Sequence, residues 1–273
     1  MNNKICAEIG INHSGNLDTA KRLINLANNA GCTHVKFQKR NPEVCVPDWK
    51  KTTRRDTPWG EMSYIDYKYK IEFGEEEYDE IFSFCSDLGI SCFASVWDLD
   101  SVDFMKNYTP IGKIPSAHLT NTELIEYSRS QFETLIVSTG MSTEEDIEKA
   151  VDAGNPDVVM HSVSSYPCDL ANLNLNYISH LKAKYPDLSI GYSGHEMGLE
   201  TLPAVVALGT DWIERHVTLD QDSWGSDQSS SLEPYQVVRM VEIVKAVEKS
   251  LGDGGPRHIL ECEKDKKKSL RGK

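Results

Sequence analysis

The sequence predicts a (β/α)8 TIM barrel, an α/β fold in which eight parallel strands are each followed by a helix. Three observations predict it. Eight short apolar runs alternate with helix-like segments along the whole chain. The runs are apolar almost throughout rather than at every second residue, as in parallel strands that are covered on both faces. The chain has 273 residues, and a single barrel domain usually takes about 250.

The strands are expected where β-branched and apolar residues cluster. A doubly wound sheet is the structural alternative, but it usually has fewer strands and carries a glycine fingerprint early in the chain, which is not present. The predicted strands are residues 4–10, 33–39, 91–96, 111–116, 134–140, 157–165, 189–194 and 211–218.

The segments between the strands have the spacing of helices. Apolar residues repeat at helical intervals from Leu17 to Ala30. The segment "STEEDIEKAVDAG" predicts a helix that begins with a capping box, Ser142 to Glu145, and stops at Gly154. Further helices are predicted at residues 75–88, 98–107, 122–130, 175–184, 200–208 and 234–251.

Two segments do not fit the β-α alternation. Residues 41–74, rich in Trp, Arg and Tyr, follow the second strand and are too long for an ordinary βα loop of about 2–6 residues. A long insertion at that end of a barrel predicts a lid or an oligomer contact. Residues 252–273 are glycine-rich and then lysine-rich, so the domain is expected at 1–251, with a partly ordered extension at 252–273.

The composition limits which partners the protein is expected to bind and in which cell compartment it is expected. Lys plus Arg total 29 against 42 Asp plus Glu, a net charge of −13, which argues against nucleic acid and anionic membranes as partners. The seven cysteines form no CxxC pair, and several lie in apolar runs, which predicts reduced thiols. The sequence shows no signal peptide and no run of about 20 apolar residues. A cytoplasmic location is therefore expected.

Charged and polar residues gather where the predicted strands end. The stretch "DWIERHVTLDQDSWGSDQ" begins as a buried strand and then carries much charge. In a TIM barrel the carboxyl ends of the strands build the active site. The residues expected there are Glu8, Asn12, His13, Lys36, Gln38, Ser95, Lys113, Ser116, Ser138, Thr139, Ser164, Tyr166, Ser193, His195, Glu214 and His216.

These residue types suit two ligands. Lysines and hydroxyls that converge on one pocket suit a phosphate, and two histidines with a carboxylate on neighbouring strands suit a divalent metal. Each residue alone has an ordinary alternative, such as a core histidine or a rim salt bridge. Glu8 is harder to dismiss, because a buried carboxylate costs several kcal/mol unless it is paired or functional. The residues indicate a barrel enzyme for an anionic substrate, with metal dependence open.

Several motifs resemble one family. "AEIGINHSGNLDTAKRLINLANNAGCTHVKFQ", "IVSTGMST", "GYSGHEMG" and "ALGTDWIERHVTLD" are similar to the sialic acid synthase (N-acetylneuraminate synthase-like) family, and the resemblance covers residues 4 to about 257. It implies a cytoplasmic, metal-dependent transferase of sialic acid biosynthesis. Such an enzyme condenses phosphoenolpyruvate with an N-acetylmannosamine-type or related acylamino hexose to give a nonulosonic acid and phosphate.

The resemblance also implies roles for the site residues. His195 and His216 are expected to bind Mn²⁺ or Mg²⁺ with Glu214 beside the metal, and Glu8 is expected to handle protons. Gln38, Tyr166 and Asp227 are expected to contact the acceptor sugar. The phosphoenolpyruvate ligands implied are Lys36, Ser95, Lys113, Ser116, Ser138, Ser164 and Ser193. A homodimer is also implied.

The sequence departs from the family pattern at three points. His118 stands where many members carry an acidic residue, and Ser164 stands where an Asn is common. The family usually continues into an antifreeze-like domain, which this sequence does not include, so a separate chain that caps the site is one expectation.

Two other functions compete with the leading one. The first is a 3-deoxy-octulosonate or heptulosonate phosphate synthase-like activity on a sugar phosphate, and the second is a non-catalytic barrel subunit. A basic cluster at the acceptor end would favour the first, and the only candidates in the sequence are Lys51, Arg54 and Arg55.

Overall fold

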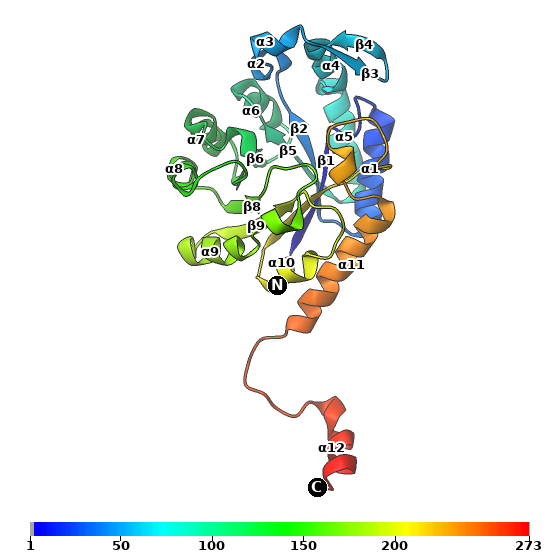
Figure 1. Ribbon diagram of the computed structural model, residues 1–273, viewed down its shortest axis with the longest axis vertical. Helices are drawn as coiled ribbons and strands as arrows, with labels where there is room; N and C mark the ends of the chain where they lie inside the picture. Colours follow the sequence, from blue (N-terminus) through cyan, green and yellow to red (C-terminus); the bar gives the residue numbers. More distant parts are fainter. Residues whose placement is uncertain (1–2, 273) are drawn as a thin grey trace.

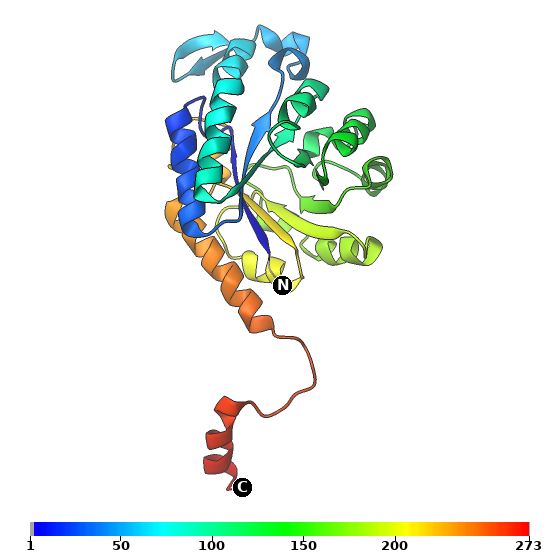
Figure 2. The ribbon, with the colours of Figure 1, turned by 180° about the vertical axis from the view of Figure 1, so that it is seen from behind.

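Eight parallel strands close into a barrel in the computed structural model, which describes residues 3–272 (Figures 1 and 2). The order around the barrel is β1-β10-β9-β8-β7-β6-β5-β2, and the predicted TIM barrel is confirmed. The strands are β1 (Lys4–Gly10), β2 (His34–Lys39), β5 (Ser91–Val96), β6 (Ile111–Ile114), β7 (Thr134–Ser138), β8 (Val158–Ser162), β9 (Ser189–Gly194) and β10 (Trp212–His216).

Pairing of the first and last strands closes the barrel. Glu8 on β1 lies opposite His216 on β10 and, on its other side, opposite Lys36 on β2. Three polar residues from distant parts of the sequence are thereby brought to one level near the carboxyl ends of the strands.

One helix covers the barrel after each strand, with an insertion before the second of them. The helix that follows β7 is α8, and its capping box is Thr143 with Asp146, each side chain accepting from the other's backbone N–H. The predicted box at Ser142 and Glu145 is wrong, because Ser142 instead donates to the carbonyl of Gly140. The helices are α1 (Leu17–Ala30), α5 (Glu75–Leu88), α6 (Leu99–Met105), α7 (Thr122–Gln131), α8 (Glu144–Gly154), α9 (Asn176–Lys184), α10 (Leu202–Ala207) and α11 (Pro234–Leu251).

Two apolar clusters hold these layers together. The larger one lies between the strands and the surrounding helices. The smaller one consists of Cys6, Phe93, Ile136, Val158, Met160 and Trp212. Each of these six residues stands two or four positions before a polar residue of its strand that faces the barrel interior, so it shares that inward face. The barrel interior is therefore apolar near the start of the strands and polar near their ends.

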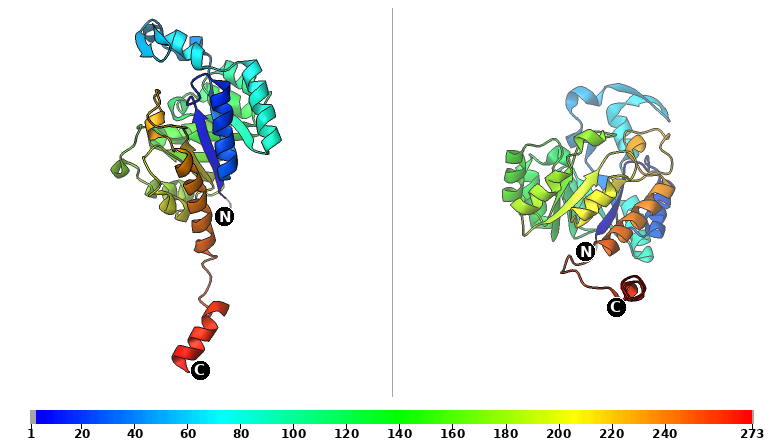
Figure 3. Two further views of the ribbon diagram at one scale, coloured as in Figure 1. Left: turned by 90° about the vertical axis from the view of Figure 1, so that its right-hand side faces the viewer. Right: turned by 60° about the horizontal axis from the view of Figure 1, so that its bottom comes forward.

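The insertion at 41–74 is a structured element rather than a loop. It contains α2 (Pro42–Cys45), α3 (Asp48–Lys51), the antiparallel hairpin β3 (Arg54–Thr57) and β4 (Gly60–Ser63), and α4 (Tyr64–Ile71). Trp224, in the loop after β10, lies with its ring centroid 5.3 Å from that of Tyr67 and 6.0 Å from that of Trp59. The insertion thus packs on the loop after β10, at the end of the barrel away from the N-terminus (Figure 3).

The chain leaves the barrel after α11. Residues 252–260 form no regular structure, and α12 (Lys264–Arg271) follows with its residues exposed. Figure 1 shows this segment extending away from the end of the barrel opposite the insertion. The expected boundary at residue 251 coincides with the end of α11, and the partial order of the extension stays a prediction.

Two expectations about the whole chain can be checked against the structure of residues 3–272. None of the helices described there is long and apolar enough to cross a membrane. The cysteines are all free thiols, and Cys6, Cys32, Cys85, Cys92 and Cys168 are buried, as the sequence predicted.

Truncation of Phe93 tests the inner cluster. Phe93→Ala is expected to lower the free energy of unfolding by about 3–5 kcal/mol, because it leaves a cavity among side chains that close the barrel. Urea unfolding followed by circular dichroism measures this change. Phe84→Ala on the outer side of α5, where Phe84 is half-buried, is expected to cost about 1 kcal/mol. Equal losses of unfolding free energy in both variants would show that the inner cluster contributes no more to stability than the half-buried Phe84.

Candidate active site

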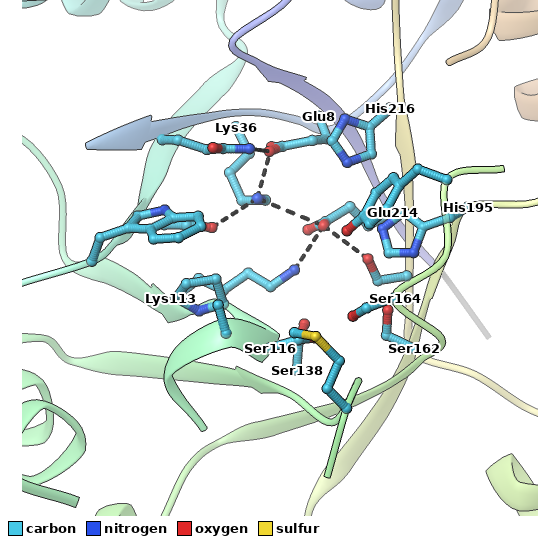
Figure 4. Close-up of a pocket in the computed structure, with 18 residues that line it drawn as sticks. Glu8, Lys36, Lys113, Ser116, Ser138, Ser162, Ser164, His195, Glu214 and His216 are labelled. Atoms are coloured by element: carbon cyan, nitrogen blue, oxygen red, sulfur yellow. Dashed lines mark hydrogen bonds and ion pairs between the residues drawn. The ribbon is translucent and has the colours of Figure 1, made fainter. Parts of the chain in front are cut away.

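A pocket opens at the carboxyl ends of the strands (Figure 4), and it contains every residue with a predicted catalytic, metal-binding or substrate-binding role except Asp227. Its walls come from all eight strands or the turns directly after them. The lining residues are Glu8, Lys36, Gln38, Ser95, Trp97, Lys113, Pro115, Ser116, Ala117, Ser138, Met141, Ser162, Ser164, Tyr166, Ser193, His195, Glu214 and His216.

Two lysines and two carboxylates form a buried charged network at the base of the pocket. Lys36 Nζ lies 2.7 Å from Glu8 Oε2 and 3.6 Å from Glu214 Oε1, and Lys113 Nζ lies 2.7 Å from the same Glu214 oxygen. These four side chains are 1–4% exposed. Because the two positive and two negative charges balance, the network tolerates burial that a single charge would not.

Hydroxyl groups complete the contacts of this network. Ser193 Oγ donates to Glu214 Oε1 at 3.0 Å, and Lys36 Nζ donates to Ser95 Oγ at 2.8 Å. Both serines were predicted to lie at the site, and both are held by the charged groups. Each lysine therefore points into the pocket with its ammonium group already oriented.

Glu8 and Glu214 differ in acidity although they share the network. Burial raises the pKa of Glu8 to about 7, against the lowering effect of Lys36. Burial also disfavours the ionised form of Glu214, but Lys113 and Lys36 outweigh it and lower the pKa of Glu214 to about 2. Glu214 therefore stays ionised to hold the lysines, and Glu8 is the carboxyl group that exchanges a proton near neutral pH.

Gly10 and Gln38 set the position of the Glu8 carboxylate. Gln38 Nε2 donates to Glu8 Oε1 at 3.1 Å. A Cβ on Gly10 would lie 3.0 Å from the same oxygen and 3.1 Å from Gln38 Nε2, and Gly10 has a φ of 54°. A residue with a side chain would be strained there and would crowd the Glu8–Gln38 pair.

Serine hydroxyls without partners line the wall opposite Glu8. The Oγ atoms of Ser138, Ser162 and Ser164 are buried and make no hydrogen bond to any residue that the structure describes. Ser116 Oγ accepts from the N–H of Gly140 at 3.0 Å, and a Cβ on Gly140 would lie 2.3 Å from Ser164 Oγ. Buried donors are rarely left unsatisfied. Together with the two lysines, they form a cradle whose chemistry suits a small phosphate or carboxylate anion.

Ser162 is a site residue that the sequence interpretation missed. It stands two residues before Ser164. Strand β8 was predicted as 157–165 and ends at Ser162, and side chains two residues apart on a strand share a face. This period could have identified Ser162 together with Ser164.

His195 and His216 face each other at the pocket rim, with ring centroids 5.5 Å apart. His195 Nδ1 lies 2.8 Å from the carbonyl oxygen of Val163, so this nitrogen carries the proton and Nε2 keeps its lone pair. Burial lowers the pKa of His195 to about 3 and also lowers that of His216. Both rings are therefore neutral at pH 7, which is the form that binds metals.

A metal at this place would have two ligands from the protein. Within residues 3–272, no three His, Cys, Asp or Glu side chains are arranged to hold a metal ion together. The two imidazoles nevertheless fit a divalent cation, because His216 Nδ1 is buried without a hydrogen bond and Asp227 Oδ2 lies 3.9 Å from it. The remaining ligands would come from water or substrate, as at metal sites that stay open for reaction.

Arg215 fixes the turn that carries His195. It is fully buried on the outer face of β10, and its Nη1 lies 3.1 Å from Glu196 Oε1 and 3.1 Å from the Gly198 carbonyl oxygen. Tyr192 and Thr201 also donate to the Glu196 carboxylate, at 2.9 and 2.6 Å. The charge of Arg215 is thus structural, whereas its neighbours Glu214 and His216 face the pocket.

Other residues near the strand ends lie outside the pocket. Asp227 is next to His216 but does not line the cavity. His118 packs edge-on against Trp97 with ring centroids 5.2 Å apart. The expectation that Asn12, His13 and Thr139 line the pocket is wrong. Asn12 Nδ2 donates to the Val217 carbonyl oxygen at 2.9 Å, His13 stacks on Phe73, and Thr139 Oγ1 donates to the Met160 carbonyl oxygen at 3.1 Å.

The chain matches the NeuB family model over residues 23–255. It belongs to the NeuB family. The N-acetylneuraminate-9-phosphate synthase of Homo sapiens is 36% identical over 267 residues, which span 95% of this chain and 74% of that protein. The N,N'-diacetyllegionaminic acid synthase of Campylobacter jejuni is 31% identical over 281 residues, 97% of this chain and 81% of that protein.

A solved structure agrees with this assignment. The N-acetylneuraminic acid synthetase of Leptospira borgpetersenii, solved in complex with citrate, superimposes with a TM-score of 0.87 at 31% identity and covers 100% of this chain and 94% of that chain. The predicted family is confirmed, and so is the prediction that this NeuB-family chain is a phosphoenolpyruvate-dependent condensing enzyme.

Neutralising Glu214 tests the charged network. Glu214→Gln is expected to lower the free energy of unfolding by about 3 kcal/mol, because two buried lysines then share one carboxylate. Urea unfolding at pH 7 measures the loss. Glu61→Gln, which breaks an exposed pair with Arg54, is expected to cost less than about 1 kcal/mol. If both variants lost the same small amount, Glu214 would not be the counter-ion of the lysines.

Proposed function

We propose that this NeuB-family enzyme condenses phosphoenolpyruvate with an N-acetylmannosamine-type or related acylamino hexose to give a sialic acid-like nonulosonic acid and phosphate. The observation that carries the proposal is the cradle of Lys36, Lys113 and unpartnered serine hydroxyls beside two neutral histidines. The names of relatives support the product class, since they include synthases of N-acetylneuraminate 9-phosphate and diacetyllegionaminic acid.

The cradle has the chemistry to hold both anionic groups of phosphoenolpyruvate. The ammonium groups of Lys36 and Lys113 supply charge, and the hydroxyls of Ser138, Ser162 and Ser164 supply donors that have no other partner. A bound anion would share the lysines with Glu8 and Glu214. Holding the enol phosphate in one orientation directs its methylene carbon toward the pocket opening, where an aldehyde can approach.

The reaction requires a new carbon–carbon bond and the loss of phosphate. The methylene carbon attacks the aldehyde carbon, and positive charge develops at the carbon that carries the phosphate. A water molecule adds to that carbon, and phosphate then leaves with cleavage of its bond to carbon. Ionised Glu8 can stabilise the positive centre and accept the proton of the water, because its pKa lies near 7.

We also propose that His195 and His216 hold Mn²⁺ or Mg²⁺. Such a cation, when bound, polarises the aldehyde oxygen as a Lewis acid and stabilises the negative charge that develops there. Val163 orients the ring of His195 through its carbonyl oxygen, and Asp227 lies beside His216. The Val163 contact leaves the unprotonated Nε2 of His195 available to a ligand.

The acceptor sugar is proposed to lie over Gln38 and Tyr166. Tyr166 stands above the histidine pair with its ring centroid 4.2 Å from that of His195 and 6.0 Å from that of His216. Asp227 lies on the His216 side of the pocket opening. These groups offer hydrogen-bond donors and acceptors to sugar hydroxyls. The homodimer, the capping chain and any effect of His118 on the acceptor stay predictions.

The octulosonate or heptulosonate phosphate synthase-like alternative is weaker. Of the three basic residues that would favour it, Lys51 pairs with Glu43 and Asp48, and Arg54 pairs with Glu61 at the surface. The non-catalytic alternative is opposed by the complete charged network.

Phosphate release and 2-keto acid formation, measured with added metal and a panel of acylamino hexoses, test the proposal. Product from a simple aldose phosphate alone would contradict it.

Removal of one imidazole tests the metal assignment. His216→Ala is expected to lower turnover about 10³-fold or more, because Lewis-acid stabilisation worth several kcal/mol is lost. Titration calorimetry with Mn²⁺ is expected to show weaker binding, while circular dichroism shows an unchanged fold. His180→Ala, which removes an exposed imidazole on α9, is the matched control. Unchanged Mn²⁺ affinity and turnover in His216→Ala would remove this metal site.

The acidity of Glu8 predicts the pH dependence of the reaction. Because Glu8 must be ionised to accept a proton and its pKa is raised to about 7, kcat/KM for phosphoenolpyruvate is expected to fall as pH drops below about 7. Gln38→Leu removes a donor to the Glu8 carboxylate and is expected to move this limb to higher pH. Initial rates across the neutral range measure both. A limb that stays near pH 4.5 in both proteins would exclude this role for Glu8.

A further inference from the structure

A second cavity lies between the start of helix α1, the loop after β10 and the β3–β4 hairpin of the insertion. Its volume is about 510 Å³, within the range of about 300–1,000 Å³ that is usual for ligand pockets. Among the residues that the structure describes, it shares no lining residue with the pocket of Glu8 and His216. The proposed reaction does not use it, so it is a separate place for a ligand.

The lining of this cavity is polar but mostly uncharged. Side-chain amides come from Asn12, Asn16 and Gln228, and serines and threonines add hydroxyl groups. Burial lowers the pKa of His13 to about 3, so this ring is also neutral at pH 7. Amides and hydroxyls both donate and accept hydrogen bonds, as the hydroxyl groups of a sugar do. The active-site pocket, with its buried lysines, has a different character that suits anions.

Asn12 supplies a buried acceptor that has no donor. The residue is 6% exposed. Its Nδ2 donates to the Val217 carbonyl oxygen at 2.9 Å and to Ser231 Oγ at 2.8 Å, so both of its N–H bonds are used. Its Oδ1 is buried and accepts no hydrogen bond from any residue within 3–272. Buried acceptors are rarely left in this state, and a hydroxyl or N–H group of a ligand in the cavity would complete it.

Trp59 adds an aromatic surface to the cavity. It is 40% exposed, and its ring meets that of Trp224 nearly edge-on, with centroids 6.0 Å apart and an angle of 75° between the planes. This contact holds the indole in place although much of it lies in water. The C–H face of a sugar ring would cover the indole, while the hydroxyl groups of the sugar bond to the amides around it.

Two charged residues, Arg22 and Asp220, line the cavity, and both are exposed. Asp220 Oδ1 accepts from the N–H of Asp222 at 2.9 Å, so its other oxygen remains an acceptor for a hydroxyl group. The guanidinium group of Arg22 has the geometry to bind a carboxylate through two parallel N–H bonds. The lining as a whole therefore suits a sugar that carries one carboxylate.

We propose, on the basis of the proposed function, that this cavity binds the sugar-acid product of the reaction, a nonulosonic acid, at a second site apart from the active site. Of the reactants and products, this molecule alone has both sugar hydroxyls and a carboxylate, because phosphoenolpyruvate lacks the former and the acceptor lacks the latter. Arg22 binds the carboxylate, Trp59 covers the ring, and Asn12 accepts from a hydroxyl or acylamino N–H group.

The cavity and the active site share the loop after β10. Ser231 Oγ, which accepts from Asn12, donates to the carbonyl oxygen of Asp227 at 2.6 Å. The carboxylate of Asp227 in turn lies 3.9 Å from His216 Nδ1. A product molecule in the second cavity therefore contacts the same loop that places Asp227 beside the histidine pair.

Titration calorimetry with N-acetylneuraminate tests this site, with saturating phosphoenolpyruvate present so that the active-site cradle is occupied. About one N-acetylneuraminate is expected to bind per chain. Arg22→Met is expected to weaken binding about tenfold or more, as for loss of a charged hydrogen bond, and Trp59→Ala about tenfold. The methyl ester of N-acetylneuraminate, which has no charge, is expected to bind the wild-type enzyme as weakly as the free acid binds Arg22→Met.

Matched controls lie outside the cavity. Arg239→Met removes an exposed arginine of α11 that pairs with Glu242, and Trp49→Ala removes an indole of the insertion that is 76% exposed. Both are expected to bind N-acetylneuraminate as the wild-type enzyme does. Should Trp59→Ala fail to fold, the exposed Arg22 supplies the decision through Arg22→Met and the methyl ester.

The outcomes separate this inference from the proposed function. Without product, Arg22→Met is expected to keep the wild-type kcat/KM for both substrates, and a loss would place Arg22 at the acceptor and overturn the second site. No binding in the presence of phosphoenolpyruvate, or binding that depends on neither Arg22 nor Trp59, also overturns it and leaves the condensation reaction intact. If no acylamino hexose is condensed, the proposed function fails, whereas the calorimetry still decides whether the cavity binds a sugar acid.

Discussion

Two carboxylates hold two lysines inside the barrel, and the rest of the site depends on this arrangement. Taking four charges out of water costs several kcal/mol for each ion, and contacts of 2.7 Å within a balanced set offset that cost. Because Glu214 remains ionised, Lys36 and Lys113 keep their positions before any substrate arrives. The ordering of two long side chains is then already complete when an anion binds, which favours both affinity and alignment of the reacting carbons.

Along each barrel strand, the inward residues near the start contribute to stability and those near the end belong to the pocket. On the inward face of β10, Trp212 belongs to the apolar cluster, whereas Glu214 and His216 belong to the pocket. Strand β1 repeats this arrangement with Cys6 and Glu8. The apolar half closes the barrel and contributes stability, and the polar half is thereby free to hold unpaired hydroxyls and neutral imidazoles. The charge at the end of the last strand, which is unusual for a buried run, follows from this division.

The sequence predicted the parts of the protein that local pattern determines. Continuous apolar runs located all eight strands, and the strand-end rule located the pocket residues on them. What it missed depends on contacts between distant segments. Asp227 lies beside His216 but outside the cavity, because the loop that carries it folds back toward the insertion. The burial of Lys68 escaped notice because it depends on the fold of α4, which places the ammonium group beside the rings of Tyr64 and Tyr67.

The two ends of the pocket are built from different kinds of structure. The cradle of lysines and serine hydroxyls is formed by strand residues and glycine-dependent turns, and a Cβ at Gly140 alone would collide with Ser164 and Ser116. The region above the pocket opening is formed by α4 and by the loop after β10, which contact each other through Trp224 and Tyr67. Side chains on such an insertion can change without disturbing the barrel core, because they share few contacts with it. Under the proposed function, the common step of the reaction is expected to depend on the rigid strands, and the choice of acceptor on the insertion.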